Sequence, residues 1–292
     1  MKKQFFSIGK ISIALNHEPA LDIVLDSAFY NFTSEPIDSP DMVFDLDLTS
    51  PFPDTTACKK IFTTAPGGLW TILESPDKNG YIISLQNMER DERPYKTVQT
   101  DVKFSRFMIH YRPNTSGRVI PLEYPLDELA VSGHLNLNRI GIILHSACIS
   151  FNGKGYLFSG VSGSGKSTLS EIWRKDGETD VLTDERVIIR EIDGKLRAYG
   201  TPWHGTAQIH KNAGAPIDKI FFIKHGKCNR AAPLTKRDAA NRLMVRCFPT
   251  FWNREGMDFT VDFCLRIAGG IDCYELEFIP DESVIEYVKG MG

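Results

Sequence analysis

The first 125 residues alternate short apolar runs with clusters of turn-forming residues. The runs at 11–15, 69–73, 81–85 and 104–111 have the length and texture of β-strands. Clusters rich in proline and aspartate separate them, for example at 38–41 and 50–54. We therefore predict a β-rich N-terminal domain over residues 1–125, with a boundary near 121–125.

From residue 126 onward the pattern predicts a mixed α/β domain that extends to residue 292. A helix begins at 126–130, and strand-like runs at 140–151 and 155–159 are joined by Asn152–Gly153, a pair that favours a hairpin because both residues tolerate positive φ. A helix at about 166–175 follows, which we expect Gly177 to end as a left-handed cap. Further strands are predicted at 181–183, 187–192, 196–199, 217–223 and 273–279. Thr235 is expected to cap another helix, and a short helix follows the last strand.

The composition is that of a globular protein without a polyelectrolyte surface. Hydrophobic residues make up 42% of the chain and charged residues 24%. The length of 292 residues suits two domains. A net charge of −3 argues against general attraction to nucleic acid or to membrane surfaces. The apolar stretch near the N-terminus breaks at Ser7 and Gly9, so we expect no signal peptide and a cytoplasmic location. The six cysteines form no C-x-x-C pair, which favours free thiols.

One stretch carries a specific chemical signal. The segment Gly160-Val161-Ser162-Gly163-Ser164-Gly165-Lys166-Ser167 fits the pattern G-x-x-x-x-G-K-[ST] in full. The glycines let backbone N–H groups approach phosphate oxygens, and the helix that begins near Lys166 turns its positive end toward the same anion. The alternative is a flexible glycine loop. The predicted nucleotide site consists of Gly160, Ser162, Gly163, Ser164, Gly165, Lys166 and Ser167, with Thr168 at the helix start.

In this interpretation ATP is the default nucleotide and Mg²⁺ its companion ion. Lys166 would reach the β- and γ-phosphates, and the Ser167 hydroxyl would bind Mg²⁺. A second acid is expected, and Asp184 ends the strand after the glycine-loop helix, where a carboxylate can reach Mg²⁺ or the substrate. The alternative for Asp184 is an aspartate that starts a turn. Glu185 is either an exposed charge or a partner of these groups, and His145, in mid-strand, is a core residue or a catalytic one.

Two other groups are weaker candidates. The segment 201–205 follows a strand, so His204 could act as a ligand or acid and Trp203 as a substrate platform; the alternative is an aromatic turn packed on the core. Phosphoryl transfer also favours a cation near the transferred group. The candidates for that cation, each otherwise a surface charge, are Arg230, Arg237 and Arg242.

The segment from His145 to Val187 resembles the catalytic domain of HPr kinase/phosphorylase, a fold shared more distantly with ATP-dependent phosphoenolpyruvate carboxykinases. In the HPr kinases a histidine-bearing strand leads through a glycine turn to a G-x-S-G-x-G-K-S loop, and an acidic doublet, an arginine and a β-branched residue follow. Here the order is Leu144-His145-Ser146, Asn152-Gly153, the glycine loop and Thr183-Asp184-Glu185-Arg186-Val187. The close match covers about 45 residues.

The resemblance implies roles for these residues. Asp184 would take the proton from the acceptor hydroxyl, and His145 and Glu185 would orient it. In the carboxykinases the corresponding acid binds metal, so Asp184 has two roles open to it. The Glu-x-Arg-Gly-Leu-Gly segment of the HPr kinases is replaced here by residues 198–205, which argues against a phosphorylase half-reaction and against HPr as the acceptor. Because HPr kinases form oligomers, a homo-oligomer is also compatible with the resemblance.

Three functions follow from these observations. The first is an ATP-dependent kinase that phosphorylates a hydroxyl on a small metabolite or on a serine of a peptide or protein. The second is a nucleotide-sensing module that engages a partner through its N-terminal half. The third is a carboxykinase-type lyase, for which the oxaloacetate-binding arginine and histidine have no counterparts in the sequence.

Overall fold

A computed structural model describes residues 1–64, 70–86, 94–112, 117–161 and 163–291. Its internal contacts divide the chain into two compact units, unit 1 (1–138 with 250–256) and unit 2 (139–249 with 257–292). Each unit contains one eight-stranded sheet, so the chain is a mixed α/β protein with few helices. The units divide after helix α1 (Leu126–Leu137), whereas the sequence placed a boundary before this helix.

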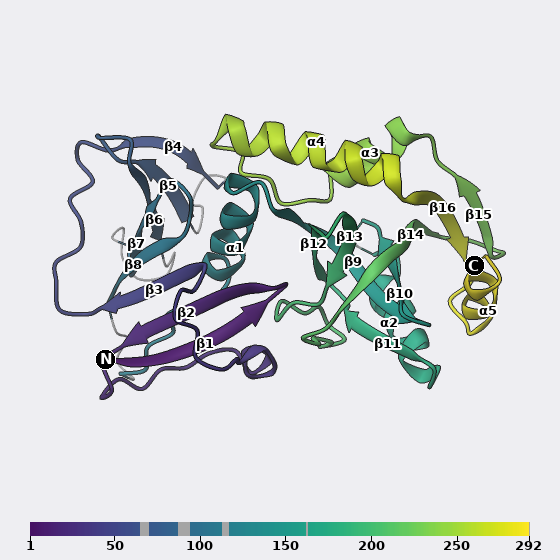
Figure 1. Ribbon diagram of the computed structural model, residues 1–292, viewed down its shortest axis with the longest axis horizontal. Coiled ribbons are helices and arrows are strands. Elements are labelled where there is room, and N and C mark those ends of the chain that lie inside the picture. Colours follow the sequence, from purple (N-terminus) through teal and green to yellow (C-terminus); the bar gives the residue numbers. More distant parts are fainter. Residues whose placement is uncertain (65–69, 87–93, 113–116, 162, 292) are drawn as a thin grey trace. The chain divides into compact units, whose positions relative to one another are not determined.

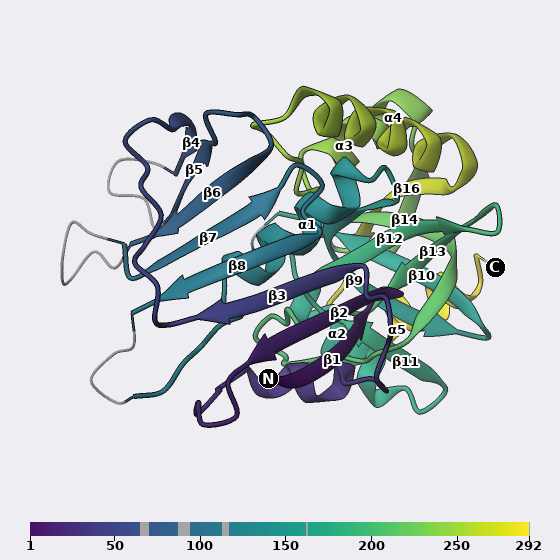
Figure 2. The same ribbon diagram turned by 60° about the vertical axis from the view of Figure 1, so that its left-hand side comes forward.

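Unit 1 is built on one mixed sheet in the order β1-β2-β3-β8-β7-β6-β5-β4. Its strands are β1 (Lys2–Ile8), β2 (Ile11–His17), β3 (Met42–Asp47), β4 (Lys59–Thr63), β5 (Trp70–Glu74), β6 (Gly80–Leu85), β7 (Lys96–Asp101) and β8 (Arg106–Tyr111). The 3₁₀ helix η1 (Ser27–Phe32) follows β2. Figure 2 shows β3, β8, β7 and β6 side by side. The strands predicted at 11–15, 81–85 and 104–111 are confirmed with shifted ends, and the run at 69–73 matches β5 except for residue 69, which lies outside the described residues.

A lysine lies fully buried in unit 1. The Lys96 ammonium donates to the carbonyl oxygen of Ile120 at 2.7 Å and forms an ion pair with Glu123 Oε1 at 2.5 Å. Tyr95 donates its hydroxyl to the same carboxylate oxygen at 3.0 Å. Burial lowers the pKa of Lys96, and the charge of Glu123 opposes that shift. A buried ammonium is tolerated when it is paired and hydrogen-bonded in this way.

Unit 2 contains the candidate site residues that were predicted from the sequence. Its strands are β9 (Gly141–Phe151), β10 (Lys154–Ser159), β11 (Thr179–Thr183), β12 (Arg186–Ile192), β13 (Lys195–Tyr199), β14 (Gly214–His225), β15 (Arg230–Pro233) and β16 (Asp272–Phe278). They follow the order β10-β9-β12-β13-β14-β16-β15, with β11 paired to β9. Strand β10 also pairs in parallel with β14, so the path from β10 through β14 closes on itself.

Helices cover both faces of the unit 2 sheet. They are α2 (Lys166–Lys175), α3 (Lys236–Met244), α4 (Arg254–Gly270) and α5 (Ser283–Lys289). Because successive strand residues point to opposite faces, Leu157 packs in a core with residues of α3 and α4, while Phe158 packs in a second core with residues of α2 and α5. The two pairs of helices lie on different sides of these strands in Figure 1.

The local predictions for this part are largely confirmed. Asn152 and Gly153 have φ of 49° and 72° and join β9 to β10 in a hairpin. Thr235 Oγ1 accepts from the Asp238 N–H at 3.1 Å at the start of α3. The left-handed cap at Gly177 is wrong: α2 ends at Lys175, Asp176 has φ of −78°, and its N–H donates to the carbonyl oxygen of Trp173. Helix α4 was not predicted. Among the described residues, no helix combines the length and apolar character that crossing a bilayer requires.

Candidate functional site

The glycine loop 160–165 connects the end of β10 to the start of α2, and its glycines are required by close packing, by a positive φ or by both. A Cβ on Gly160 would lie 2.2 Å from Ser164 Oγ. Gly163 and Gly165 have φ of 77° and 96°, which other residues rarely adopt. The segment therefore turns tightly between a strand and a helix.

Lys166 turns its side chain back into this loop. Its Nζ donates to the carbonyl oxygen of Gly160 at 3.0 Å, and the residue is buried. Burial lowers the pKa of Lys166, and the negative charge of Glu185 opposes that shift. The hydroxyl of Ser164 is also buried, and among the described residues it has no hydrogen-bond partner. The loop therefore holds one cationic and one unsatisfied polar group within a tight backbone turn.

The carboxyl ends of three neighbouring parallel strands support the loop. Strand β14 pairs in parallel with β10 on one side and with β16 on the other. At the end of β14, His225 Nε2 lies 2.9 Å from the carbonyl oxygen of Gly163, and the His225 ring stacks on Phe278 of β16 at 5.8 Å. A Cβ on Gly165 would lie 2.9 Å from Phe278 and 3.0 Å from His225. His225 was missed by the sequence analysis, because the strand predicted there ended at residue 223. In the structure it lies at the carboxyl end of a parallel strand, where ligand-binding residues gather in α/β sheets.

Asp184 and Glu185 form the acidic doublet, which separates two strands that pair with β9. Strands β11 and β12 both pair with β9, and Asp184 and Glu185 form the bend between them. Asp184 is 0% exposed, and its two carboxylate oxygens accept the N–H groups of Gly205 and Ala207 at 2.9 and 3.0 Å. Asp184 therefore holds the segment 205–207 in place and faces away from solvent.

Glu185 forms a charged cluster with its neighbours. Its Oε1 lies 3.1 Å from His145 Nε2 and 2.6 Å from Arg186 Nη1. The hydrogen bond from His145 and the charges of His145 and Arg186 lower the pKa of Glu185 to about 2. Burial acts in the opposite direction but is outweighed. The register of β9 and β12 brings these three residues together, because His145 on β9 is the direct partner of Arg186 on β12, next to Glu185. The His145–Glu185 pair is the arrangement by which a carboxylate orients an imidazole for proton transfer.

These groups open on one cavity of about 440 Å³ in unit 2. The cavity is lined by His145, Gly163, Gly165, Lys166, Ser167, Thr168, Glu185, His204, Gly205, Thr206 and His225. Of the residues predicted from sequence, Gly160, Ser164 and Asp184 lie behind the lining, and Ser162 is outside the described residues. His204 joins the cavity, as the 201–205 hypothesis allowed, and the unpredicted Thr206 donates its hydroxyl to Ser167 Oγ at 3.2 Å.

The candidate arginines lie elsewhere. Arg230 and Arg242 form ion pairs with Glu277 and Glu275, and neither they nor the exposed Arg237 line the cavity. Two other arginines, Arg186 and Arg246, act on Lys166. Their positive charges lower its pKa, although by less than the effects of burial and of the Glu185 charge. Arg246 follows α3 and belongs to no motif, so it could not be identified from the sequence.

Comparison with known proteins adds little to this geometry. No family model matches the chain, and no curated protein sequence matches it. Among solved structures, the chain is similar to the Hpr(Ser) kinase/phosphatase from Coxiella burnetii, with 10% identity and a TM-score of 0.29 over 51% of this chain and 91% of that one. Values this low indicate a distant likeness and carry no argument about function. The class that fold and site define is therefore a mixed α/β protein with a glycine-loop cavity.

Proposed function

We propose that the chain is an ATP-dependent phosphotransferase that transfers the γ-phosphate to a hydroxyl acceptor. The observation that carries the proposal is the single cavity that joins the glycine loop and Lys166 to the His145–Glu185 pair. Phosphoryl transfer needs a cationic cradle for the phosphates and a group that takes the proton of the acceptor, and this cavity offers both.

The residues of the loop fit a polyphosphate chain. The absence of side chains at Gly160 and Gly165 leaves backbone where a Cβ would collide, and the buried Ser164 hydroxyl lacks a partner among the described residues. We assign the phosphates to the backbone N–H groups at the start of α2 and to the Lys166 ammonium. Mg²⁺ would be held by the Ser167 hydroxyl, which faces the same cavity, and it would neutralise charge on the phosphate oxygens.

The geometry favours His145 as the group that accepts the proton. His145 and Glu185 line the cavity, whereas Asp184 is buried and its two oxygens are engaged by backbone N–H groups. A carboxylate whose pKa is about 2 is a weak base, but it orients an imidazole well. In this proposal Glu185 positions His145, and Asp184 holds the loop that carries His204 and Thr206. The earlier expectation, Asp184 as base or metal ligand, would require the segment 205–207 to release it.

The experiment is transfer of label from γ-labelled ATP to a panel of hydroxyl acceptors, both small metabolites and serine peptides. We expect Lys166→Ala to abolish ATP binding in calorimetry with Mg²⁺. Lys175→Ala, at the other end of the same helix, serves as the control and should bind as wild type does. Equal binding by both variants would remove the basis of the proposal.

A second set of variants separates the two candidate bases. His145→Gln should lower kcat by about 10²- to 10⁴-fold, as expected for loss of a general base, while ATP affinity stays near wild type. If Asp184→Asn instead shows that loss of kcat with unchanged stability, Asp184 is the base and the assignment to His145 is wrong.

The alternative function is a nucleotide-sensing module without turnover. The burial of Asp184 under the segment 205–207 favours it, because the acid expected to do the chemistry is occupied in holding backbone. Tight ATP binding, no label transfer to any acceptor and a partner affinity that changes with nucleotide would establish it.

A further inference from the structure

A second cavity of about 560 Å³ lies in unit 2, away from the glycine loop. It is lined by Lys154, Glu191, Gly194, Lys195, Leu196, Pro216, Ile217, Asp218, Arg266, Gly270 and Ile271. Its size falls within the range of small-molecule sites, roughly 300–1,000 Å³. None of its residues lines the candidate nucleotide cavity.

The two cavities lie at opposite ends of the same strands. Strand β10 runs from Lys154, in the second cavity, to Ser159 beside the glycine loop. Strand β14 runs from the second cavity at Ile217 to His225 in the first. The ends are separated by five residue steps along β10 and by eight along β14, which is about 16–26 Å. The second cavity is therefore too distant to hold an acceptor for transfer at the glycine loop.

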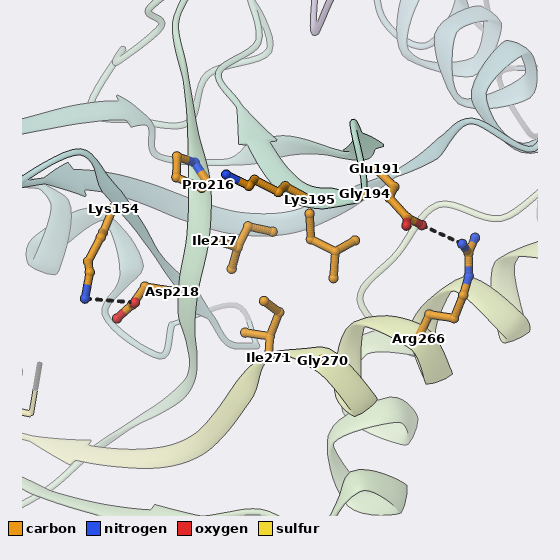
Figure 3. Close-up of a pocket in the computed structure, with 11 residues that line it drawn as sticks. Lys154, Glu191, Gly194, Lys195, Pro216, Ile217, Asp218, Arg266, Gly270 and Ile271 are labelled. Atoms are coloured by element: carbon orange, nitrogen blue, oxygen red, sulfur yellow. Dashed lines mark hydrogen bonds and ion pairs between the residues drawn. The ribbon is translucent and has the colours of Figure 1, made fainter.

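The floor of the second cavity is apolar. Leu196 and Ile271 pack against the core shared with α3 and α4 but are only partly buried, and Ile217 is 7% exposed. Figure 3 shows Ile217 and Ile271 between two ion pairs, one on either side. An apolar floor of this kind favours a ligand with a hydrocarbon body.

Both carboxylates at the rim are already paired. Asp218 binds Lys154 at 3.1 Å through Oδ1 and Lys219 at 2.8 Å through Oδ2, and Glu191 binds Arg266 at 2.6 Å. These pairs hold the rim in place at the two ends of the floor.

Lys195 is the exception. It lines the cavity, is exposed, and has no ion-pair or hydrogen-bond partner for its ammonium among the described residues. In Figure 3 its side chain extends toward Pro216, above the apolar floor. With three cations and two paired anions in the lining, the cavity has a surplus of one positive charge.

We propose that this cavity binds a small organic carboxylate with an apolar body, with the carboxylate at Lys195 and the hydrocarbon on Leu196, Ile217 and Ile271. A carboxylate pairs with the surplus ammonium without displacing either existing ion pair, whereas an amine ligand would meet like charge. An uncharged ligand would gain no ion pair with this ammonium. The proposal is independent of the nucleotide site and holds whether or not the chain transfers phosphate.

The test compares three probes of equal chain length: octanoate, octanamide and octylamine. Calorimetry on the full chain should show octanoate binding at least about tenfold more tightly than octanamide, since only the carboxylate forms an ion pair with Lys195, and no binding of octylamine. Amide NMR shifts of Gly194 and Gly270, both in the lining, report whether the ligand occupies this cavity.

Variants then test the role of the charge. Lys195→Glu should weaken octanoate binding by at least about tenfold, and Lys195→Gln should weaken it less. The matched control is Lys3→Glu, which reverses an exposed strand lysine in unit 1 and should leave octanoate binding unchanged. Circular dichroism spectra and urea unfolding midpoints equal to those of wild type confirm that the variants fold. The proposal is overturned if octanamide binds as tightly as octanoate, if Lys195→Glu has no effect, or if octanoate does not bind at about 10 mM.

Discussion

Replacing Asp184 with asparagine tests whether its carboxylate holds the segment 205–207. Asp184 is fully buried, and each of its oxygens accepts one backbone N–H, from Gly205 and from Ala207. Asparagine keeps the shape of the side chain but only one acceptor oxygen, so its NH₂ group must face one of the two N–H groups.

The cost follows from these two bonds. A hydrogen bond to a charged group contributes about 1.5–3 kcal/mol, and a buried donor left without a partner costs about 1–3 kcal/mol. Because one neutral bond survives in the variant, we expect Asp184→Asn to lower the free energy of unfolding by about 2–4 kcal/mol. For a unit of this size that corresponds to a fall in Tm of about 5–10 °C.

Urea unfolding followed by circular dichroism measures this change. Asp180→Asn is the matched control, because Asp180 lies on β11, just before Asp184, but is exposed and forms a surface ion pair with Lys211. Surface pairs of this type contribute about 0–1 kcal/mol. If the two variants lose the same small amount, Asp184 does not anchor the segment and the reasoning fails.

Three further predictions concern other features. Gly165→Ala should lower ATP affinity by at least about tenfold and stability by about 1–3 kcal/mol, because φ is positive at Gly165 and a Cβ has no room there. Gly177→Ala is the control, because the space around Gly177 is open, and it should change neither quantity. Calorimetry measures the affinity and urea unfolding the stability. Because the pKa of Glu185 is lowered from 4.5 to about 2, its ionised form contributes stability above pH 4.5 that is lost as the pH falls toward 2. Glu185→Gln should therefore be less stable than wild type by about 2 kcal/mol at pH 7, and a difference that does not shrink by pH 3 would contradict this. Lys96→Met leaves Glu123 without its buried partner and should cost about 3–5 kcal/mol in urea unfolding at pH 7; a loss below about 1 kcal/mol would show that the ion pair is dispensable.

Local chemistry was the most predictable part of this chain. Turns that require positive φ, such as Asn152–Gly153, and the strand–loop–helix around Lys166 are encoded by residues adjacent in sequence. The strand ends shifted only slightly. The unpredicted helix α4 contains the run Phe259-Thr260-Val261, whose aromatic and β-branched residues favour strands, although Phe259, Phe263 and Ile267 repeat at the four-residue spacing of one helix face.

The composition of the site was less predictable, because it depends on pairing between distant segments. The sequence indicated that an acidic doublet matters, but not that one member is buried while the other faces the cavity. That difference arises because the chain bends at Asp184 and Glu185 between two strands that share β9. His225 reaches the glycine loop through the order of strands in the sheet, and Arg246 acts on Lys166 because residues 246–248 pair with β9. No local sequence pattern encodes either arrangement.

The geometry of the site depends on the register of β9 with the strands on both of its edges. One of its edges receives β10, which leads into the glycine loop, and the other receives the segment carrying Asp184 and Glu185. A single-residue insertion within β9 would turn His145 to the other face of the sheet and offset it from both neighbours at once. During divergence, such a protein can lengthen this strand only at its ends.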